Sequence, residues 1–190
     1  MIHNDEKPSL LLHVCCAPCG THPIRLLRDT FNVTAFFCNP NIHPKSEHDT
    51  RVEEIHRLAR SWGFPLLFNK DDIQEWFQLI KGHESDPEGG KRCDICYRMR
   101  LQKTAETAVQ NGMTRFTTTL SISPHKSAEK LNRIGNEVAK QFHLQFVEAN
   151  FKKQNGFKIS CDLSREEHLY RQNYCGCVYS RREMKQRQNR

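Results

Sequence analysis

Five of the nine cysteines in this chain of 190 residues lie in two tight groups. Cys15, Cys16 and Cys19 fall within five positions, and Cys93 and Cys96 form a C-x-x-C pair. Four thiolates are the usual ligands of an iron–sulfur cluster, whereas structural zinc prefers two well-spaced pairs. Because Cys15 and Cys16 are adjacent, the spacing favours an iron–sulfur site over a zinc site, with buried thiols that bind no metal as the remaining alternative.

The segment Cys175-Gly176-Cys177 is a different kind of thiol pair. Two thiols one residue apart close only a small ring, so a disulfide between them is strained and easily reduced. Gly176 supplies the backbone freedom that such a ring needs. The motif therefore predicts a redox-active dithiol, and the alternatives are further metal ligands or inert thiols. Cys38 is either part of the site or an ordinary buried thiol, and Cys161 belongs to no group and is interpreted as incidental.

Polar side chains close to the cysteines are candidate proton donors for a reduction. These candidates are His13, His43, Asp94 and Tyr97. Each also has a structural interpretation, because a histidine within a strand is commonly a core residue and an aspartate at a helix start commonly caps the helix. Three further residues are either turn formers or ligand contacts at the rim of the site: Ser121, Ser123 and His125.

The residues around the first cysteine group predict a buried strand that ends in a thiol-lined turn. Residues 10–14 form an apolar run of strand length directly before Cys15. Thr21 is interpreted as the N-cap of a helix, because apolar residues recur at helical spacing after it. Residues 32–37 are predicted as the next strand. A strand–helix–strand unit of this kind is typical of a parallel sheet.

The rest of the chain continues this alternation of strands and helices. Strands are predicted at residues 65–68, 115–120 and 145–147, and helices at residues 46–62, 73–80, 93–108, around 131–138, 165–171 and at the C-terminus, with a mobile loop at residues 83–92. The sequence thus predicts an α/β fold, a parallel sheet between two helix layers. Because the carboxyl ends of parallel strands meet at one edge, we expect both cysteine groups there.

Length and charge predict a single domain over residues 1–190, in which residues 151–190 form a basic C-terminal extension that carries the dithiol. The net charge is +7, and residues 151–190 contain ten Lys or Arg and four Asp or Glu, which accounts for +6 of it. Such a basic surface favours nucleic acid as a partner. RNA fits best if an unpaired base enters a pocket, where Tyr170, Tyr174 or Tyr179 could stack on it.

No apolar run approaches the roughly 20 residues that a membrane-spanning helix requires. Residues 1–7 are polar and contain no hydrophobic signal core. We therefore expect a cytoplasmic protein without a membrane partner. A reducing compartment disfavours structural disulfides, so metal binding and redox chemistry become the preferred interpretations of the nine cysteines.

Five ordered motifs carry a resemblance to a known family. They are VCCAPC at residues 14–19, CNPNIHP at 38–44, CDICY at 93–97, TTTLSISP at 117–124 and YRQNYCGCVYS at 170–180. Together they resemble the epoxyqueuosine reductases of the QueH type over about residues 9–181. His48 stands where the family pattern leads us to expect an aromatic hydroxyl, and Cys161 and the tail beyond Ser180 lie outside the pattern.

The resemblance implies a cytoplasmic oxidoreductase of tRNA modification, which reduces the epoxide of epoxyqueuosine at the wobble position of the anticodon to the alkene of queuosine. It implies a fold similar to the adenine-nucleotide alpha-hydrolase (HUP) kind of α/β sheet. By the same resemblance, Cys15, Cys16, Cys93 and Cys96 bind a [4Fe-4S] cluster. The last pair of family cysteines, which forms a redox-active disulfide, corresponds to Cys175 and Cys177.

We hypothesise that iron polarises the epoxide oxygen while Cys175 and Cys177 deliver two electrons and close to a disulfide, which an external electron donor reopens. This iron belongs to the cluster or to a second, mononuclear site that involves Cys19. A rival hypothesis is a zinc-stabilised RNA-binding module without catalysis. A third, an ATP-dependent thiolation enzyme, is disfavoured because cysteines follow the first strand where a glycine- and serine-rich phosphate loop is expected.

Overall fold

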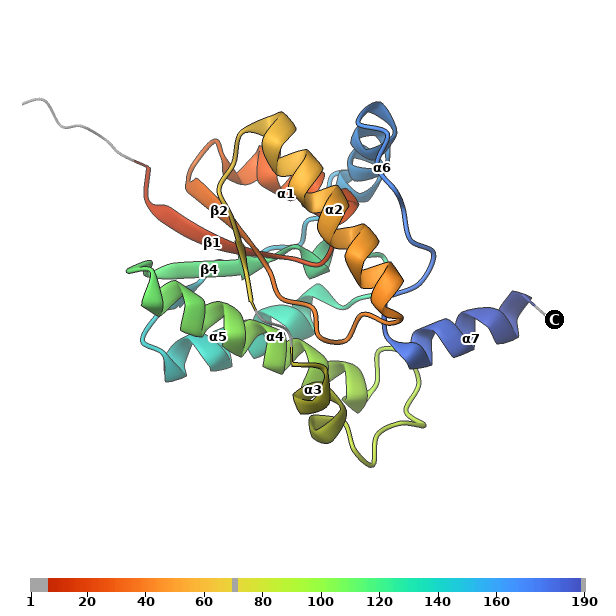
Figure 1. Ribbon diagram of the computed structural model, residues 1–190. Coiled ribbons are helices and arrows are strands. Elements are labelled where there is room, and N and C mark those ends of the chain that lie inside the picture. Colours follow the sequence, from red (N-terminus) through yellow and green to blue (C-terminus); the bar gives the residue numbers. More distant parts are fainter. Residues whose placement is uncertain (1–6, 70–71, 189–190) are drawn as a thin grey trace, which may run out of the picture.

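The computed structural model contains a five-stranded sheet in which every strand pair is parallel (Figure 1). It describes residues 7–69 and 72–188, so most of the polar N-terminal stretch and the last two residues of the basic tail lie outside the described residues. The strands are β1 Ser9–Val14, β2 Asn32–Phe37, β3 Leu66–Phe68, β4 Arg115–Thr118 and β5 Gln145–Phe146. The predicted parallel α/β sheet is therefore confirmed.

The helices cover both faces of the sheet. They are α1 Ala17–Leu27, α2 Lys45–Trp62, α3 Ile73–Leu79, α4 Lys91–Gln110, α5 Ala128–Gln141, α6 Gly156–Glu166 and α7 Val178–Gln188, with a short 3₁₀ helix, η1, at Thr119–Ile122. Helices α1 and α2 lie on one face and α4 and α5 on the other (Figure 1). Among the described residues, none of the helices is both long and apolar enough to cross a membrane.

The strand order β3-β2-β1-β4-β5 places β1 at the centre of the sheet. From β1 the chain first builds outward through β2 and β3, and then returns to the other side of β1 to form β4. The order of the strands reverses between β1 and β4, and in open α/β sheets ligands bind at the carboxyl ends of the two strands that flank this point. The residues after Val14 and Thr118 therefore line the expected crevice.

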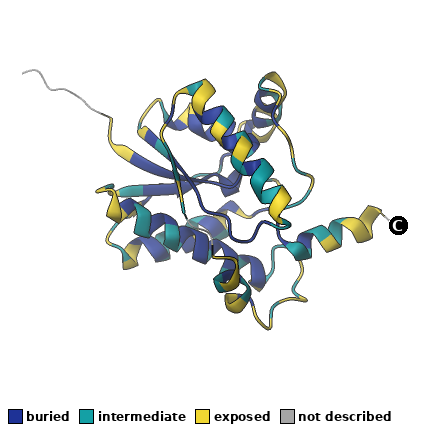
Figure 2. Ribbon diagram, viewed as in Figure 1, coloured by how far each residue is buried: buried dark blue, intermediate teal, exposed yellow. Residues whose placement is uncertain are grey.

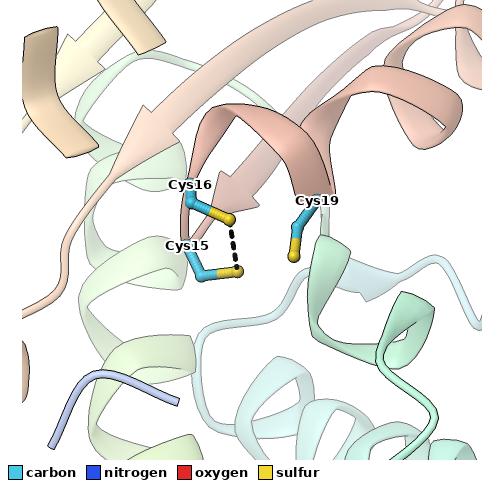
Figure 3. A group of neighbouring side chains, drawn as sticks. All are labelled: Cys15, Cys16 and Cys19. Carbon is cyan, nitrogen blue, oxygen red and sulfur yellow. Dashed lines mark hydrogen bonds between the residues drawn. The ribbon is translucent and has the colours of Figure 1, made fainter. Parts of the chain in front are cut away.

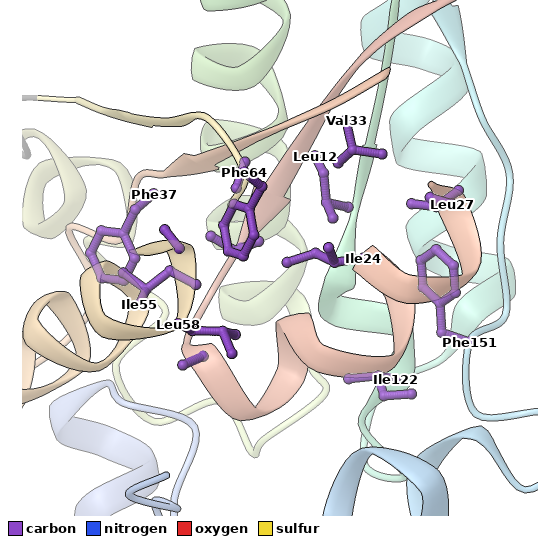
Figure 4. Packing of buried hydrophobic residues seen from close by; sticks show 14 of the residues in the cluster. Leu12, Ile24, Leu27, Val33, Phe37, Ile55, Leu58, Phe64, Ile122 and Phe151 are labelled. Carbon is purple, nitrogen blue, oxygen red and sulfur yellow. The ribbon is translucent and has the colours of Figure 1, made fainter. Parts of the chain in front are cut away.

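Strand β1 is buried on both faces, which explains why Leu10, Leu11, Leu12 and Val14 are all apolar (Figure 2). Its side chains alternate between the two layers: Leu12 packs with Ile24 of α1 and Ile55 of α2 (Figure 4), whereas Leu11 packs in the cluster that includes Leu101 of α4. Each such fully buried side chain contributes roughly 1.5–3 kcal/mol to folding. The sheet thereby holds the end of β1 rigidly in the middle of the molecule.

The predicted N-cap of the first helix, Thr21, is wrong by five residues. Helix α1 begins at Ala17, with Cys16 in an extended conformation at the N-cap position and a proline in the first turn. Proline is favoured there because its missing N–H has no helical partner at that position. Thr21 lies inside the helix, where its hydroxyl donates to the carbonyl of Pro18 at 2.9 Å. The earlier start brings Cys19 into the first turn.

The helix predicted at residues 165–171 is also wrong, because α6 spans Gly156–Glu166. Ser160 donates to the carbonyl of Pro18 at 2.6 Å and thereby docks α6 against α1. Arg57 of α2 binds the carbonyls of Glu167 and His168 at 2.9 and 3.0 Å, which holds the chain where the helix ends. The residues from there to α7 contain no regular secondary structure and carry the dithiol.

Strand β4 is shorter than predicted and ends at Thr118. The Thr118 hydroxyl accepts a hydrogen bond from the backbone N–H of Leu120 at 3.2 Å, which starts η1 in place of two further strand residues. The turn points the buried residues of η1 toward the end of β1.

Candidate active site

The first cysteine group lies where β1 passes into α1. Cys15 and Cys16 follow the end of the strand, Cys19 is in the first helical turn, and their three sulfur atoms all lie within 4.8 Å of one another (Figure 3). The Cys15 and Cys16 sulfurs are 3.8 Å apart, and Cys15 Sγ is also 3.8 Å from the Thr119 hydroxyl at the end of β4. The group therefore occupies the predicted crevice between β1 and β4.

The second cysteine group lies at the start of α4. Cys93 belongs to the same cluster of buried side chains as Cys15 and Cys16. Cys96, one turn further along α4, belongs with Cys177 to a smaller buried cluster. Both groups thus lie at the same edge of the sheet, although the tight group within 4.8 Å contains Cys19 and not the C-x-x-C pair.

The dithiol motif approaches the first group from the C-terminal extension. Cys175 lines one cavity together with Cys15 and Cys19. Cys177 is buried, and its sulfur accepts a hydrogen bond from the backbone N–H of Ser180 at 3.3 Å. Neither cysteine of the motif is in a disulfide. The chain therefore brings all three sequence motifs that contain paired or grouped cysteines to one region.

The shared cavity has a volume of about 450 Å³, which is within the usual range for sites that bind small molecules. Its wall contains three cysteines, four cationic side chains, two glutamates and one tyrosine: Cys15, Cys19, Cys175, Arg100, Lys126, Arg171, Arg187, Glu88, Glu183 and Tyr174. Positive charge at the wall favours an anionic ligand, and an aromatic ring offers a stacking surface for a base. The cavity is thus suited to a nucleotide that must meet sulfur.

Two of these cations are buried without an acidic partner in the described part of the chain. Arg100 is 1% exposed, and its guanidinium donates to His13 Nε2 at 3.3 Å and to the side-chain oxygen of Asn39. Lys126 is 9% exposed and forms no ion pair with a described residue. A buried cation is costly unless negative charge compensates it. Thiolates of the neighbouring cysteines could supply that charge, since Cys15, Cys19 and Cys175 line the same cavity as Arg100 and Lys126.

The thiols of the first group differ in their affinity for protons. Hydrogen bonds from the thiols of Cys16 and Cys19 lower the pKa of Cys15 well below its usual value. Burial raises the pKa of Cys16 to about 12, and hydrogen bonding to the other two sulfurs raises the pKa of Cys19. One thiolate therefore forms readily here, and further thiolates need a metal or another cation nearby.

The thiols of the second group, Cys93 and Cys96, also need a metal or another cation nearby to become thiolates. Burial raises the pKa of Cys93 to about 11 and also raises the pKa of Cys96. Burial would by itself lower the pKa of Lys126, but the neighbouring Cys175, Tyr97 and Cys15 groups raise it, so this side chain stays protonated. Its charge favours the thiolate forms around the cavity.

The donor set fits an iron–sulfur cluster. Two sulfur atoms already accept N–H donors: Gln172 Nε2 donates to Cys16 Sγ at 3.0 Å, and the backbone N–H of Gly89 donates to Cys93 Sγ at 3.2 Å. Hydrogen bonds of this kind surround the sulfur ligands of such clusters and influence their potentials. With Arg100 and Lys126, they compensate the negative charge that several thiolates bring into one buried region.

Most of the predicted proton donors have structural partners. His13 is fully buried between Thr118, which its Nδ1 contacts at 2.9 Å, and Arg100, and burial lowers its pKa to about 3. Asp94 forms an ion pair with Lys130 at 2.9 Å. The contacts of His13 agree with its interpretation as a core residue, whereas the interpretation of Asp94 as a helix cap is wrong, because Gly90 is the N-cap of α4.

The remaining candidates differ in position. Tyr97 is buried in the cluster that contains Cys15 and Cys93. The ring of His43 packs against Trp76 with 5.6 Å between the ring centroids. Cys38 is buried, and its sulfur accepts a hydrogen bond from Asn69 at 3.6 Å. The predicted rim residues Ser123 and His125 line the cavity, whereas Ser121 is buried and its hydroxyl accepts from the backbone N–H of Phe151 at 3.4 Å.

Four functional candidates were missed from the sequence: Arg51, Arg100, Lys126 and Gln172. Arg100 had a local signal, because it follows Cys96 by four residues and residues four apart share one face of a helix. Lys126 and Arg51 gave no such signal, since a single Lys or Arg in a polar stretch is usually exposed. Cys161 is half-buried on α6, outside the cysteine groups, as predicted.

Comparisons with known proteins identify the family of this chain. Residues 10–183 match the family model described as epoxyqueuosine reductase QueH. The chain is 39% identical over 180 residues to the epoxyqueuosine reductase QueH of Streptococcus pyogenes serotype M1, covering 92% of this chain and 71% of that protein. It is 35% identical to the Thermotoga maritima protein of the same name, covering 90% of each.

Solved structures show similarity of fold. The U34-tRNA thiolase NcsA from Methanococcus maripaludis, described with its [4Fe-4S] cluster, matches with a TM-score of 0.56 at 10% identity, covering 92% of this chain and 62% of that one. A predicted subunit of a tRNA methyltransferase from Methanocaldococcus jannaschii matches with a TM-score of 0.52 at 12% identity, covering 80% and 74%. The family match over residues 10–183 and the identities to its members establish that this chain belongs to the QueH family of epoxyqueuosine reductases, which are oxidoreductases.

Proposed function

We propose that this protein reduces the epoxide of epoxyqueuosine, at the wobble position of a tRNA anticodon, to the alkene of queuosine. The observation that carries the proposal is the cavity of about 450 Å³ whose wall includes Cys15, Cys19 and Cys175. Family membership identifies the reaction, and the cavity offers room for a modified base beside sulfur.

In this proposal Cys15, Cys16, Cys93 and Cys96 hold a [4Fe-4S] cluster. The hydrogen bonds to Cys16 and Cys93 and the buried charge of Arg100 support this assignment. So does the [4Fe-4S] cluster of NcsA, a protein of similar fold. A bound cluster would transfer electrons and supply an iron that polarises the epoxide oxygen. A separate iron bound by Cys19 stays a prediction. The sulfur of Cys19 lies in the same tight group as the sulfurs of Cys15 and Cys16.

Cys175 and Cys177 supply the reducing equivalents. Conversion of an epoxide to an alkene and water consumes two electrons and two protons. Two thiols release the same number when they form one disulfide. Cys175 lines the cavity and Cys177 is buried behind it, so the motif connects the substrate side to the protein interior. An external electron donor then reduces the disulfide before the next turnover.

The tRNA binds over the mouth of the cavity. Arg171 and Arg187 from the C-terminal extension line the cavity and offer charge to the phosphates of the anticodon loop. The guanidinium of Arg171 lies 5.7 Å from the centre of the Phe157 ring, which is 37% exposed. Unpaired anticodon bases are accessible to a pocket of this kind, because RNA loops present splayed bases. This use of tRNA agrees with the predicted cytoplasmic location.

One assay tests the proposed reaction directly. The protein, purified without oxygen, is incubated with tRNA that contains epoxyqueuosine and a chemical reductant, and the nucleosides are analysed by mass spectrometry. We expect epoxyqueuosine to lose one oxygen atom and become queuosine. Unchanged epoxyqueuosine with iron-loaded protein would refute the proposal.

The absorption spectrum separates the proposal from its rivals. A broad visible band that dithionite bleaches supports the cluster, whereas a colourless protein with stoichiometric zinc supports a non-catalytic RNA-binding module. Consumption of ATP during turnover would instead support a thiolation enzyme. The cysteines that follow β1 in place of a phosphate loop argue against that third reading.

A further inference from the structure

The guanidinium of Arg51, on α2, binds the backbone of the dithiol motif. Its two terminal nitrogens donate to the carbonyl of Cys175 at 3.1 Å and to the carbonyl of Tyr174 at 3.3 Å. The motif lies 124 residues further along the chain, so this contact exists only in the folded protein. The third nitrogen, Nε, donates to Glu47 at 2.8 Å, which holds the guanidinium in place.

The contact is buried and tightly packed. The Arg51 side chain is 1% exposed. A Cβ atom on Gly176 would lie 3.1 Å from an Arg51 nitrogen and 3.0 Å from Ile42, so a glycine is needed for the chain to pass this close. Gly176 also has a φ of +124°, which other residues rarely adopt. The close contact between Arg51 and the motif therefore depends on a glycine at position 176.

A second hydrogen bond holds the other half of the motif. The backbone N–H of His43 donates to the carbonyl of Gly176 at 2.8 Å. A disulfide between Cys175 and Cys177 would close a ring that contains the two peptide groups whose carbonyls belong to Cys175 and Gly176. The hydrogen bonds from Arg51 and His43 therefore act on both peptide groups of that ring, in a conformation in which the two thiols are free.

We propose that Arg51 is a positioning residue of the Cys175–Cys177 couple, which holds the motif open so that the dithiol form is favoured and Cys175 faces the cavity. The inference rests on the proposed function, because it assigns a role within the same redox step. In that step the two thiols lose two electrons and two protons as the S–S bond forms, and the epoxide oxygen leaves as water. Arg51 itself is neither oxidised nor reduced.

Helix α2 offers a matched control. Arg57 makes the same kind of contact: it donates to the carbonyls of Glu167 and His168 and pairs with Glu54 at 3.0 Å. These carbonyls precede the motif in the same extension. The Arg57 side chain is 42% exposed, against 1% for Arg51, and its substitution loosens the extension without touching the peptide groups that the disulfide ring contains.

The test measures the thiol–disulfide equilibrium without tRNA. Wild-type protein and the variants Arg51→Gln, Arg51→Lys and Arg57→Gln are equilibrated in buffers of reduced and oxidised dithiothreitol, and free thiols are trapped by alkylation. Trypsin should release residues 172–181 as one peptide, which contains Cys175 and Cys177 and no other cysteine. Its mass therefore reports the disulfide fraction of this pair alone.

We expect Arg51→Gln to shift the equilibrium about tenfold toward the disulfide, because it removes hydrogen bonds from a charged donor to the open form. Arg51→Lys should cause a smaller shift in the same direction, and Arg57→Gln should match the wild type. Equal equilibria in all four proteins, or equal shifts in the Arg51→Gln and Arg57→Gln variants, would overturn the inference. If the wild-type pair forms no disulfide in any buffer, the redox role of the dithiol fails instead. If Arg51→Gln does not fold, the equilibria of Arg51→Lys and Arg57→Lys are compared instead. A shift in Arg51→Lys alone supports the inference, and equal equilibria overturn it.

Discussion

The side-chain amide of Gln172 donates a hydrogen bond to the sulfur of Cys16 at 3.0 Å. The two residues are 156 positions apart in the chain, and the contact joins the C-terminal extension to the end of β1. A sulfur that accepts an N–H donor carries negative charge more easily. Through this hydrogen bond, a residue of the basic extension stabilises negative charge on a cysteine that we propose as a cluster ligand.

Replacement of Gln172 by Leu should lower the reduction potential of the cluster. The hydrogen bond from the amide offsets the extra negative charge of the reduced state, and its loss should cost about 1 kcal/mol, or about 40 mV for one electron. Redox titration followed by electron paramagnetic resonance measures this potential. Asn173→Ala is the control, because Asn173 also lines the cavity. An equal potential in the wild type, Gln172→Leu and Asn173→Ala would show that Gln172 does not influence the cluster.

Replacement of Arg100 by Met should destabilise the iron-loaded protein more than the iron-free protein. In the iron-free protein, relief of a buried cation offsets the loss of the bonds to His13 and Asn39, so the free energy of unfolding should change by less than about 1 kcal/mol. With the cluster bound, that cation compensates thiolate charge, and its loss should cost on the order of 2 kcal/mol more. Thermal unfolding of both forms measures the difference.

The conservative variant Arg100→Lys keeps the charge and should retain most of the stability of the loaded form. If Arg100→Met destabilises the iron-free and iron-loaded proteins equally, Arg100 supports the fold and not the cluster.

Replacement of Cys177 by Ser should abolish turnover while iron content stays at the wild-type level. The serine cannot form the disulfide that the two-electron step requires, but the four proposed cluster ligands remain. Iron analysis and the tRNA assay measure the two properties separately. Cys161→Ser should leave both unchanged, because Cys161 lies outside the cysteine groups on α6. Full activity in Cys177→Ser would remove the dithiol from the mechanism.

Replacement of Arg187 by Gln should weaken tRNA binding by a similar factor for every tRNA. Loss of one phosphate contact should reduce the slope of log K against log salt concentration by about 1. Filter binding at several salt concentrations measures this slope. Arg115→Gln is the control, because Arg115 begins β4 at the edge of the sheet opposite the cavity. An identical slope in the wild type and in Arg187→Gln would show that Arg187 makes no contact with an RNA phosphate.

Much of the fold could be predicted because its signals are local. The apolar run at residues 10–14 is typical of a strand buried on both faces, and β1 is such a strand. The errors arose where one local signal outweighs another or where a distant contact decides a boundary. Thr21 looks like an N-cap in the sequence, but the turn after β1 and Pro18 start α1 earlier. The end of α6 depends on Arg57, which the chain brings in from α2.

The grouping of the cysteines was visible from their spacing, and spacing alone already favoured metal and redox chemistry over scattered core thiols. The sequence could not reveal which cations face them. Arg100 and Lys126 are functional candidates because they are buried beside sulfur, and burial is a property of the folded chain. Both would be ordinary surface charges in another fold.

By itself, the sequence determined the type of sheet and the family, together with the presence of two kinds of cysteine motif, because strand periodicity and motif spacing are local properties of the chain. Only the tertiary structure decided that α2 would hold the dithiol motif through Arg51 and that Gln172 would reach Cys16. Those contacts span more than a hundred residues. They form because the parallel sheet brings the ends of β1 and β4 together and the C-terminal extension packs across them.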